Sequence, residues 1–307
     1  MGWRMNRDRA ILVQAPAKIN LVLRVLDRRP DGYHNLWSLM QTVDVSDTLE
    51  ARVTPDRPGI HLACDDASLP TDRRNLIYRA AEAVLGRAGR PEDAGLSITI
   101  AKRIPVSAGL GGGSSNAAAT ILALNELLQL GWSAHDMMKV GAPLGSDVPF
   151  FFCAPSAVVT GRGEAVEAVT LSGTRWVVLV NPGFPIETKW AYEQLSARRS
   201  GVAPLADSWR RIGGGATLSW DQIIPLMEND FEAAVGPAHP ELGKVASALR
   251  GAGAEAAMLS GSGATVFGIF RDEAAAVRAK RVLSATPGWR VFAGAAGTGP
   301  LVCASIV

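Results

Sequence analysis

The feature that most constrains this sequence is a glycine-rich segment between a predicted strand and a predicted helix. The strand is expected at Leu96–Ile104 and ends at Pro105, and the helix is expected from about Ser115 to Leu130. Glycines let a backbone approach a ligand closely, and the start of a helix adds unpaired amides and a partial positive charge. Such a segment can bind the phosphate groups of a ligand. A flexible connector, the alternative, would not need four glycines, two hydroxyls and a helix start to coincide.

Other phosphate-binding motifs do not match this segment. A Walker A loop needs a lysine after its last glycine, and none is present here. The dinucleotide fingerprint needs Gly or Ala three residues after its second glycine, where this segment has Ser114. Gly251–Ala256 does match that fingerprint, but it follows a helical pattern instead of a strand. Because H-R-D and D-F-G are also missing, a protein kinase is excluded.

The rest of the chain mixes strand and helix patterns without repeats. Strands are expected at Ile11–Val25, where Pro16 interrupts the pattern, and at Phe150–Phe152 and Trp176–Val180. This mixture predicts an α+β protein of two domains, with the junction near residue 165. Residues 197–220 carry two arginine pairs and three consecutive glycines, which predicts a mobile insertion.

Composition limits the partners of the chain. Its 307 residues carry a formal net charge of only +2, without a basic tract, so nucleic acid is not an expected partner. The cysteines Cys64, Cys153 and Cys303 are far apart and indicate reduced thiols in the cytoplasm. No apolar stretch has the length of a signal peptide or a membrane span, so no membrane partner is expected. The sequence leaves monomer and homodimer open.

Two side chains are candidates for chemistry on a hydroxyl group. Asp147 lies in the loop Gly145–Pro149 and could act as a base, or it could be a turn aspartate that bonds to its own backbone. Lys18 could neutralise that aspartate or a developing alkoxide. Asn20 shares its strand face, because side chains alternate along a strand. Whether Asp147 takes a proton or only orients the hydroxyl stays open.

Six segments resemble motifs of the GHMP kinases, a family that includes galactokinase and the homoserine, mevalonate and phosphomevalonate kinases. They follow one another in the order of the family, and only the first ten residues and 197–220 depart from its pattern. The segments are Ala15–Leu21, Asp31–Leu36, Pro105–Asn116, Gly145–Phe151, Asn229–Glu232 and Leu259–Thr265.

This resemblance implies a small-molecule kinase that uses ATP and Mg²⁺. It implies an N-terminal ATP-binding and catalytic domain at 1–165 with an unusual left-handed βαβ unit, and a C-terminal ferredoxin-like domain at 166–307. Lys18 and Asp147 would be the catalytic pair, and Ser114 or Ser115 could ligate Mg²⁺ or cap the helix. The residues expected around the ATP phosphates are Pro105, Val106, Ser107, Ala108, Gly109, Leu110, Gly111, Gly112, Gly113, Ser114 and Ser115.

Other positions follow from the same resemblance. Asn75, Leu76 and Lys102 would border the adenine of ATP. The second glycine-rich run, formed by Gly261, Ser262 and Gly263, would close the site from the C-terminal domain, or it could be only a tight turn.

The three consecutive glycines Gly111–Gly113 resemble one branch of the family most. That branch phosphorylates the 2-hydroxyl of 4-diphosphocytidyl-2-C-methylerythritol in the non-mevalonate pathway to isoprenoid precursors. The partner would then be a small molecule that carries a cytidine diphosphate group. Asn20 would contact it, Tyr33 and Tyr192 would sandwich the cytosine, and His34 would read its edge; for both tyrosines simple packing is the alternative.

Two other functions compete with this one. A homoserine or mevalonate kinase-like enzyme would share the fold, but the Tyr33-His34 pair and the triple glycine argue against it. A catalytically inactive nucleotide-binding sensor would share the fold too, but it would not need both Lys18 and Asp147.

Overall fold

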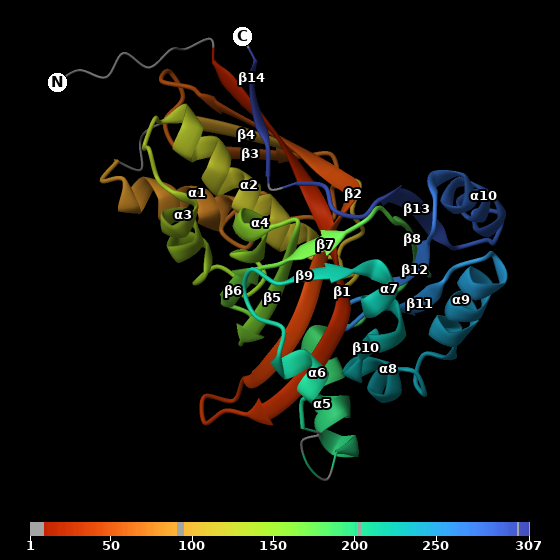
Figure 1. Ribbon diagram of the computed structural model, residues 1–307. Coiled ribbons are helices and arrows are strands. Elements are labelled where there is room, and N and C mark those ends of the chain that lie inside the picture. Colours follow the sequence, from red (N-terminus) through yellow and green to blue (C-terminus); the bar gives the residue numbers. More distant parts are fainter. Residues whose placement is uncertain (1–8, 91–94, 200, 202–203, 300, 307) are drawn as a thin grey trace.

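The computed structural model describes residues 9–90, 95–199, 201, 204–299 and 301–306. Residues 1–8 and 91–94 of the predicted first domain lie outside the described residues, as do 200, 202, 203, 300 and 307 of the second. The described chain forms an eight-stranded sheet, a four-stranded sheet and a two-stranded sheet, packed with helices (Figure 1). The predicted α+β class is confirmed.

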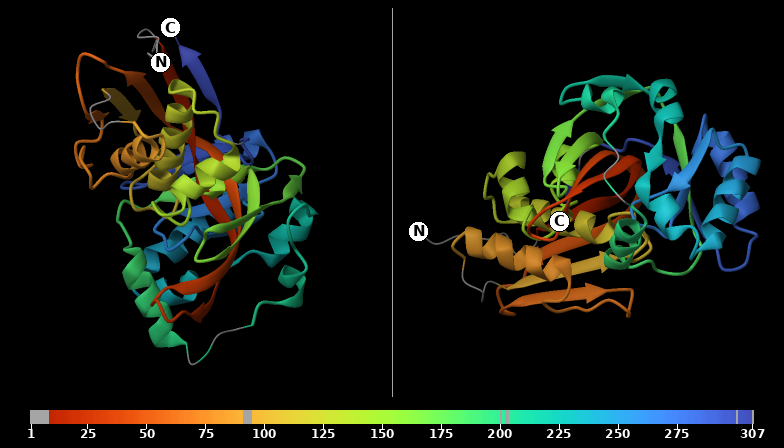
Figure 2. Two further views of the ribbon diagram at one scale, coloured as in Figure 1. Left: turned by 90° about the vertical axis from the view of Figure 1, so that its left-hand side faces the viewer. Right: turned by 90° about the horizontal axis from the view of Figure 1, so that it is seen from below.

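A long hairpin crosses the molecule. Its strands β1 (Ala10–Arg28) and β2 (His34–Val53) pair antiparallel, and most of β1 is buried. Pro16 does not end β1; instead the ladder shifts register between Pro16 and Ala17, which is how a strand accommodates a residue without an N–H. The tip of the hairpin reaches the lower end of the molecule, beside the segment of α5 (Thr188–Arg198) (Figure 1; Figure 2, left).

Six further strands complete the first sheet. They are β3 (Ile60–Cys64), β4 (Leu96–Ala101), β5 (Ser156–Gly161), β6 (Ala165–Ala168), β10 (Glu228–Asn229) and β14 (Cys303–Ile306). β3 and β4 pair in parallel, and α1 (Leu76–Arg87) lies between them in sequence, so a βαβ unit is present; its hand stays a prediction. β10 and β14 belong to the second half of the chain yet pair with β1, and the boundary at residue 165 also stays a prediction.

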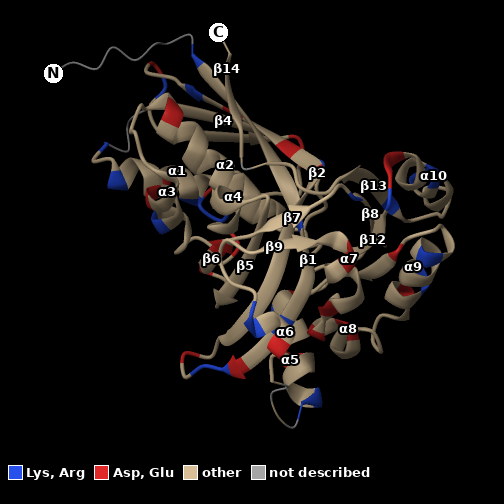
Figure 3. Ribbon diagram, in the orientation of Figure 1, with Lys and Arg blue, Asp and Glu red and all other residues tan. Residues whose placement is uncertain are grey.

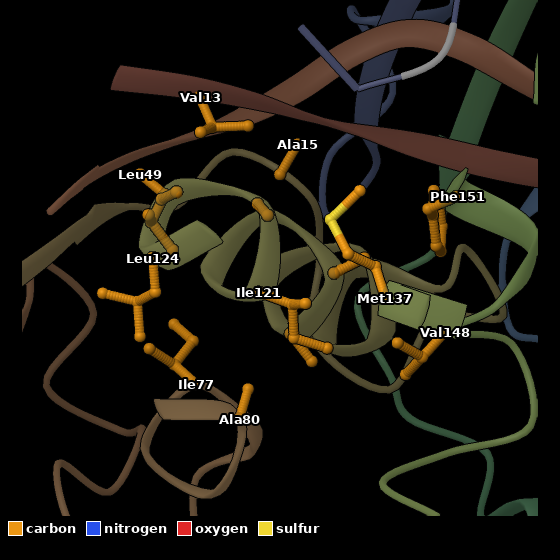
Figure 4. Packing of buried hydrophobic residues seen from close by; sticks show 14 of the residues in the cluster. Val13, Ala15, Leu49, Ile77, Ala80, Ile121, Leu124, Met137, Val148 and Phe151 are labelled. Carbon is orange, nitrogen blue, oxygen red and sulfur yellow. The ribbon is translucent and has the colours of Figure 1, made fainter. Parts of the chain in front are cut away.

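The core of this half surrounds α2 (Gly112–Leu127), which begins at Gly112 instead of at about Ser115. Its alanines Ala117, Ala118 and Ala119 are fully buried, so the helix lies close to the hairpin strands. Figure 4 shows side chains of α2 between the strands on one side and α1, α3 (Ala134–Gly141) and α4 (Phe150–Cys153) on the other. The labelled residues include Val13, Leu49, Ile77, Ile121, Leu124, Met137, Val148 and Phe151.

The predicted strand at Phe150–Phe152 is wrong, because these residues form α4. Phe150 and Phe151 are consecutive and both fully buried, whereas neighbours on a strand face opposite sides. Such a short apolar run does not reveal its period, so the sequence alone could not decide. The helical turn continues directly from the loop of Asp147: the N–H of Phe151 donates to the carbonyl of Val148 at 3.3 Å.

The second sheet has the strand order and connections of a ferredoxin-like domain. Its neighbours are all antiparallel in the order β11-β12-β8-β13, and helices connect the first strand to the second and the third to the fourth. The strands are β8 (Trp176–Asn181), β11 (Ala256–Leu259), β12 (Val266–Phe270) and β13 (Arg290–Ala295), and the helices of this half are α5, α8 (Asp230–Val235), α9 (Pro240–Gly251) and α10 (Glu273–Leu283). The predicted C-terminal architecture is confirmed.

The described residues of the predicted insertion at 197–220 carry secondary structure, and their mobility stays a prediction. They form α6 (Asp207–Arg210) and β9 (Thr217–Ser219), which pairs with β7 (Thr170–Ser172), and α7 (Trp220–Ile223) and a 3₁₀ turn (Ile224–Leu226) follow. Trp209 is only 2% exposed, and its ring centre lies 5.3 Å from that of Trp37 on β2. Although this stretch is rich in arginine and glycine, its buried Trp209 side chain packs it against β2.

Charges of both signs are mixed over the described chain. Figure 3 shows acidic and basic residues interspersed on helices such as α9 and α10. Among the described helices, none combines the length and the apolar character that crossing a membrane requires.

The burial of Trp209 leads to a stability prediction. Trp209→Ala should lower the free energy of unfolding by about 3–5 kcal/mol, because it removes a buried aromatic ring and leaves a cavity. Urea denaturation would measure the change. Val282→Ala, at a position that is 63% exposed, is the control and should change it by less than about 0.5 kcal/mol. A Trp209 variant as stable as the control would show that the segment does not anchor to β2.

Candidate active site

One cavity of about 940 Å³ brings most of the predicted site residues together. Its wall includes Lys18 and Asn20 on β1, Asp147, Tyr192 on α5, and both glycine-rich loops. Of the predicted residues, Tyr33, His34 and Ser115 do not line it; the others do. The cavity therefore lies between the first sheet and the C-terminal half, where segments far apart in sequence meet.

The first glycine loop ends in a helix start that has no side-chain cap. Gly111 occupies the N-cap position with φ +67°, and α2 has no acidic residue in its first turn. The first amides of the helix are thus left for an external acceptor, and the helix dipole favours an anion there. Gly111 must lack a side chain, because a Cβ would lie 2.8 Å from Cγ of Lys18. The helix start is therefore open to an anion, and the binding of phosphate there stays a prediction.

The second glycine loop packs directly on the first. The hydroxyl of Ser260 donates to the carbonyl of Gly109 at 2.9 Å, and the amide of Thr265 donates to the carbonyl of Ala108 at 3.2 Å. A Cβ on Gly109 would lie 2.0 Å from the carbonyl oxygen of Ser260. Gly261, Ser262 and Gly263 line the cavity beside this contact. The run is a tight turn that also forms one wall of the site.

Lys18 and Asp147 come together as the sequence predicts. Their Nζ and Oδ2 atoms are 3.5 Å apart, and the Lys18 side chain is 5% exposed. Lys18 also donates to Oδ1 of Asn20 at 2.7 Å, and Asn20 donates to the hydroxyl of Ser38 at 2.8 Å. The amide of Lys18 donates to the carbonyl of Leu110 at 2.9 Å, which ties β1 to the phosphate loop. A buried ammonium thus lies between a carboxylate and an amide at the wall of the cavity.

Lys102 lines the cavity, but its ammonium group is held by a residue that sequence analysis missed. Asp47 on β2 is fully buried and pairs with Lys102, whose Nζ also donates to Oδ1 of Asn116 at 2.8 Å. The same carboxylate accepts the amides of Arg103 and Ile104 at 2.7 and 2.9 Å, and the side-chain amide of Asn116 at 2.9 Å. In the sequence, Asp47 could have been noticed as an aspartate on an otherwise apolar strand face.

Asn75 and Leu76 form the wall at the start of α1. The side chain of Asn75 accepts from the amide of Ile77 at 3.0 Å and donates to the carbonyl of Pro70 at 2.8 Å. Its polar atoms are thus engaged in capping α1. Leu76 supplies apolar surface to the cavity near Gly113, as the closest atom to a Cβ at that glycine is Cδ1 of Leu76 at 3.5 Å.

The two serines of the phosphate loop differ in their surroundings. Ser114 lines the cavity, and its hydroxyl lies 3.6 Å from the position of a Cβ on Gly145, in the loop of Asp147. Ser115 is fully buried, lies outside the cavity wall, and its hydroxyl has no hydrogen-bond partner. Neither hydroxyl caps α2. The geometry therefore favours Ser114 for any contact with a ligand.

The structure does not bring the predicted tyrosine pair together. Tyr33 is 58% exposed at the hairpin tip, with the guanidinium of Arg162 over its ring, 5.2 Å from its centre. His34 instead stacks on Tyr192, with ring centres 5.0 Å apart and an angle of 17°. Burial, with a smaller effect of the Asp147 charge, raises the pKa of Tyr192 to about 12, so its hydroxyl stays protonated.

Comparisons with known proteins identify the family of the chain. Residues 75–154 match the model of the GHMP kinases N terminal domain, and residues 203–287 match that of the GHMP kinases C terminal domain. The 4-diphosphocytidyl-2-C-methyl-D-erythritol kinase of Geobacter sp. (strain M21) is 42% identical over 92% of this chain and 97% of its own length. Its counterpart in Syntrophotalea carbinolica is 43% identical over 91% of this chain and 96% of its own length.

The chain belongs to the GHMP kinase family. A crystal structure of a 4-(cytidine 5′-diphospho)-2C-methyl-D-erythritol kinase superimposes on this GHMP kinase with a TM-score of 0.77 and 33% identity, over 94% of this chain and 100% of the other. A homoserine kinase from Cytophaga hutchinsonii gives 0.73 at 20% identity, over 99% and 100% of the two chains, and so shows the shared fold alone. The predicted small-molecule kinase on a GHMP fold is confirmed.

The contact between the two glycine loops leads to a prediction about ATP binding. Gly109→Ala should weaken ATP binding about tenfold or more, because the methyl group would displace a loop whose backbone approaches its neighbour too closely for a side chain. Calorimetry with a non-hydrolysable ATP analogue measures this.

Gly243→Ala on α9 is the control. Gly243 lies outside the cavity wall and a Cβ there would meet nothing within 4 Å, so the affinity should remain. Equal losses in the two variants would contradict the assigned role of the loop contact.

Proposed function

We propose that this GHMP kinase transfers the γ-phosphoryl group of ATP to the 2-hydroxyl of 4-diphosphocytidyl-2-C-methyl-D-erythritol, in the non-mevalonate pathway to isoprenoid precursors. One observation carries the proposal: a single cavity joins the phosphate loop and the Lys18–Asp147 pair with the aromatic wall at Tyr192. Relatives named for this substrate match more than nine tenths of the chain. The homoserine and mevalonate kinases among the structural neighbours are at most 20% and 15% identical, respectively.

In this proposal Asp147 orients the substrate hydroxyl and accepts its proton. The hydroxyl oxygen forms a bond to the γ-phosphorus while the bond to the β–γ bridging oxygen breaks, and ADP leaves. Lys18 pairs with the Asp147 carboxylate before transfer and stabilises the negative charge that develops on the hydroxyl oxygen and the phosphoryl group during transfer, and Asn20 fixes the direction of its ammonium group. The amides at the start of α2 hold the phosphates.

We propose that the ATP phosphates, and not a cluster of protein side chains, supply most of the ligands of Mg²⁺. The residues described contain no cluster of three or more His, Cys, Asp or Glu side chains that could hold a metal. Mg²⁺ in such enzymes usually keeps several waters and takes one or two protein oxygens beside the phosphates. The Ser114 hydroxyl and the Asp147 carboxylate are oxygens of the required kind at the cavity wall. The ion would offset the charge of the transferring phosphoryl group.

The cytidine end of the substrate is assigned to the hairpin tip and α5. Tyr192 offers an aromatic face on the cavity wall, and His34, which stacks on it, offers ring nitrogens to the edge of the base. Tyr33 precedes His34 at the exposed hairpin tip, and its ring would exchange the Arg162 guanidinium for the other face of the base. Base–aromatic stacking contributes roughly 1–3 kcal/mol per base in nucleic-acid binders, enough to select a cytidyl substrate.

A coupled assay of ADP release with a panel of alcohols tests the function. The panel contains 4-diphosphocytidyl-2-C-methyl-D-erythritol, 2-C-methylerythritol without the cytidine diphosphate, homoserine and mevalonate. The cytidyl compound should give the highest kcat/KM. Faster turnover of homoserine or mevalonate would overturn the proposal, and ATP binding without turnover of any alcohol would indicate an inactive sensor.

Asp147→Asn tests the role of the carboxylate. Loss of a positioned base should lower kcat by roughly 10²–10⁴-fold while ATP binding survives. Asp44→Asn on the exposed face of β2 is the control and should leave kcat unchanged. Steady-state kinetics and calorimetry separate the two parameters. An Asp147 variant within a few-fold of the parent kcat would rule out the base assignment.

His34 makes substrate binding sensitive to pH. Burial lowers the pKa of His34, and the positive charges of Arg28 and Arg199 lower it further, so the imidazole stays neutral near pH 7. The KM for the cytidyl substrate should therefore be flat from pH 8 down to the ordinary histidine pKa of about 6.5, and should rise only at more acidic pH. The His34→Gln variant, which cannot titrate, should lose this dependence. An equal rise of the KM at acidic pH in the parent and the variant would show that a group other than His34 titrates.

A further inference from the structure

Three consecutive residues at the junction of β10 and α8 each contact a different wall of the cavity. They are Asn229, Asp230 and Phe231, part of a segment that resembles the family but has no part in the chemistry described above. Asn229 contacts the second glycine loop, Asp230 contacts β1, and Phe231 contacts α5. One short segment thus touches all three walls.

Asn229 uses every hydrogen-bonding atom of its side-chain amide. Its Oδ1 accepts from the amide of Phe231 at 2.9 Å, which caps α8, and its Nδ2 donates to the carbonyls of Leu259 and Gly261, both at 2.8 Å. The backbone partners, one donor and two acceptors, fix the orientation of the amide. The side chain is almost fully buried. Asn229 therefore sets the position of the loop that packs on Gly109.

Asp230 holds the hairpin that carries Lys18, Asn20 and His34. Its carboxylate accepts the amide of Val25 at 2.7 Å and forms ion pairs with Arg24 at 3.3 Å and Arg199 at 2.5 Å. Arg199 in turn donates to the carbonyl of Val25 at 2.6 Å. The N–H and the carbonyl of Val25 thus both form hydrogen bonds with the Asp230–Arg199 ion pair. β10 adds a parallel pairing with β1 at residues 22 and 23.

Phe231 contacts the third wall of the cavity, the aromatic wall at Tyr192. It is 2% exposed, lines the cavity, and meets the ring of Tyr192 edge-on, with centres 4.9 Å apart. Tyr192 in turn stacks on His34. The orientation of the aromatic wall is therefore tied to the same short segment.

We propose that Asn229–Phe231 is a positioning segment that fixes the separation between the phosphate end and the hairpin end of the cavity. Asn229 sets the second glycine loop over the phosphate loop, and Asp230 and Phe231 set the hairpin and the aromatic wall. A molecule that contacts both ends then has its hydroxyl directed at Lys18 and Asp147. The assignment of the hairpin end to cytidine rests on the proposed function; the positioning itself does not.

Two isosteric substitutions separate the contacts. Asn229→Asp keeps the acceptor that caps α8 but loses both donors and places a charge against two carbonyls. Asp230→Asn keeps an acceptor for the Val25 amide but loses the charge that pairs with two arginines. Asp272→Asn is the matched control: Asp272 caps α10, accepts from the amide of Ala275 at 2.8 Å, and does not line the cavity.

Hydrogen exchange followed by mass spectrometry provides the direct measurement on the full chain. Asn229→Asp should raise exchange around residues 259–265 and leave 22–36 at the parent level, whereas Asp230→Asn should do the reverse. Asp272→Asn should change neither region. Exchange that rises equally in both regions, or no more than in the control, would overturn the proposal.

Kinetics provide a second readout that general destabilisation would not produce. Asn229→Asp should lower kcat and raise the KM for ATP, and Asp230→Asn should mainly raise the KM for the cytidyl substrate, each by about tenfold or more, because small misplacements of reacting groups are costly. Losses of the same kind in both variants, in proportion to their melting temperatures, would overturn it too. If the parent enzyme does not turn over the cytidyl substrate, the proposed function fails while the exchange data still decide this proposal.

Discussion

The buried carboxylate of Asp47 is the interaction on which the phosphate loop depends. It lies on β2, pairs with Lys102, and binds two backbone amides at the end of β4 and the side chain of Asn116 on α2. A fully buried charge is tolerated only when it is paired and hydrogen-bonded, and removing one partner of such a pair costs roughly 3–5 kcal/mol. Two of the three elements that it joins, β4 and α2, are the ones that enter and leave the glycine loop. Their relative positions are therefore set before any ligand binds.

Close backbone contacts impose a second constraint on the same loop. Gly109 lies so near the carbonyl of Ser260 that no side chain fits, and Gly111 leaves room for the stem of Lys18. Both glycines also have positive φ, +77° and +67°, a conformation that other residues adopt at a cost. The glycines of the phosphate loop thus serve the contacts with β1 and with the second glycine loop as well as access for phosphate.

Local chemistry allowed much of this site to be predicted from the sequence. The glycine loop, the shared strand face of Lys18 and Asn20, and the loop of Asp147 depend on neighbouring residues, and each lies where it was expected. The role of Asp47 could not be found this way, because its partners lie 55 to 69 residues further along the chain. The fold of the stretch at 197–220 depends on Trp209 reaching Trp37 on β2, a contact that no local pattern encodes. The pairing of His34 with Tyr192 likewise requires the hairpin tip and α5 to meet in space.

The charges around the cavity explain why this loop works without the lysine of a Walker A motif. Lys18 is paired with Asp147 and Lys102 with Asp47, so neither ammonium presents its full charge to an incoming phosphate. The attraction that remains comes from the unpaired amides and the dipole at the start of α2, which lie in fixed positions. In the proposed reaction Lys18 becomes available for charge that develops during transfer, because the proton that Asp147 would accept removes the negative charge that had offset the lysine. In that reaction the pairing of Lys18 with Asp147 would couple proton removal to stabilisation of the transferred group at the same point in the cavity.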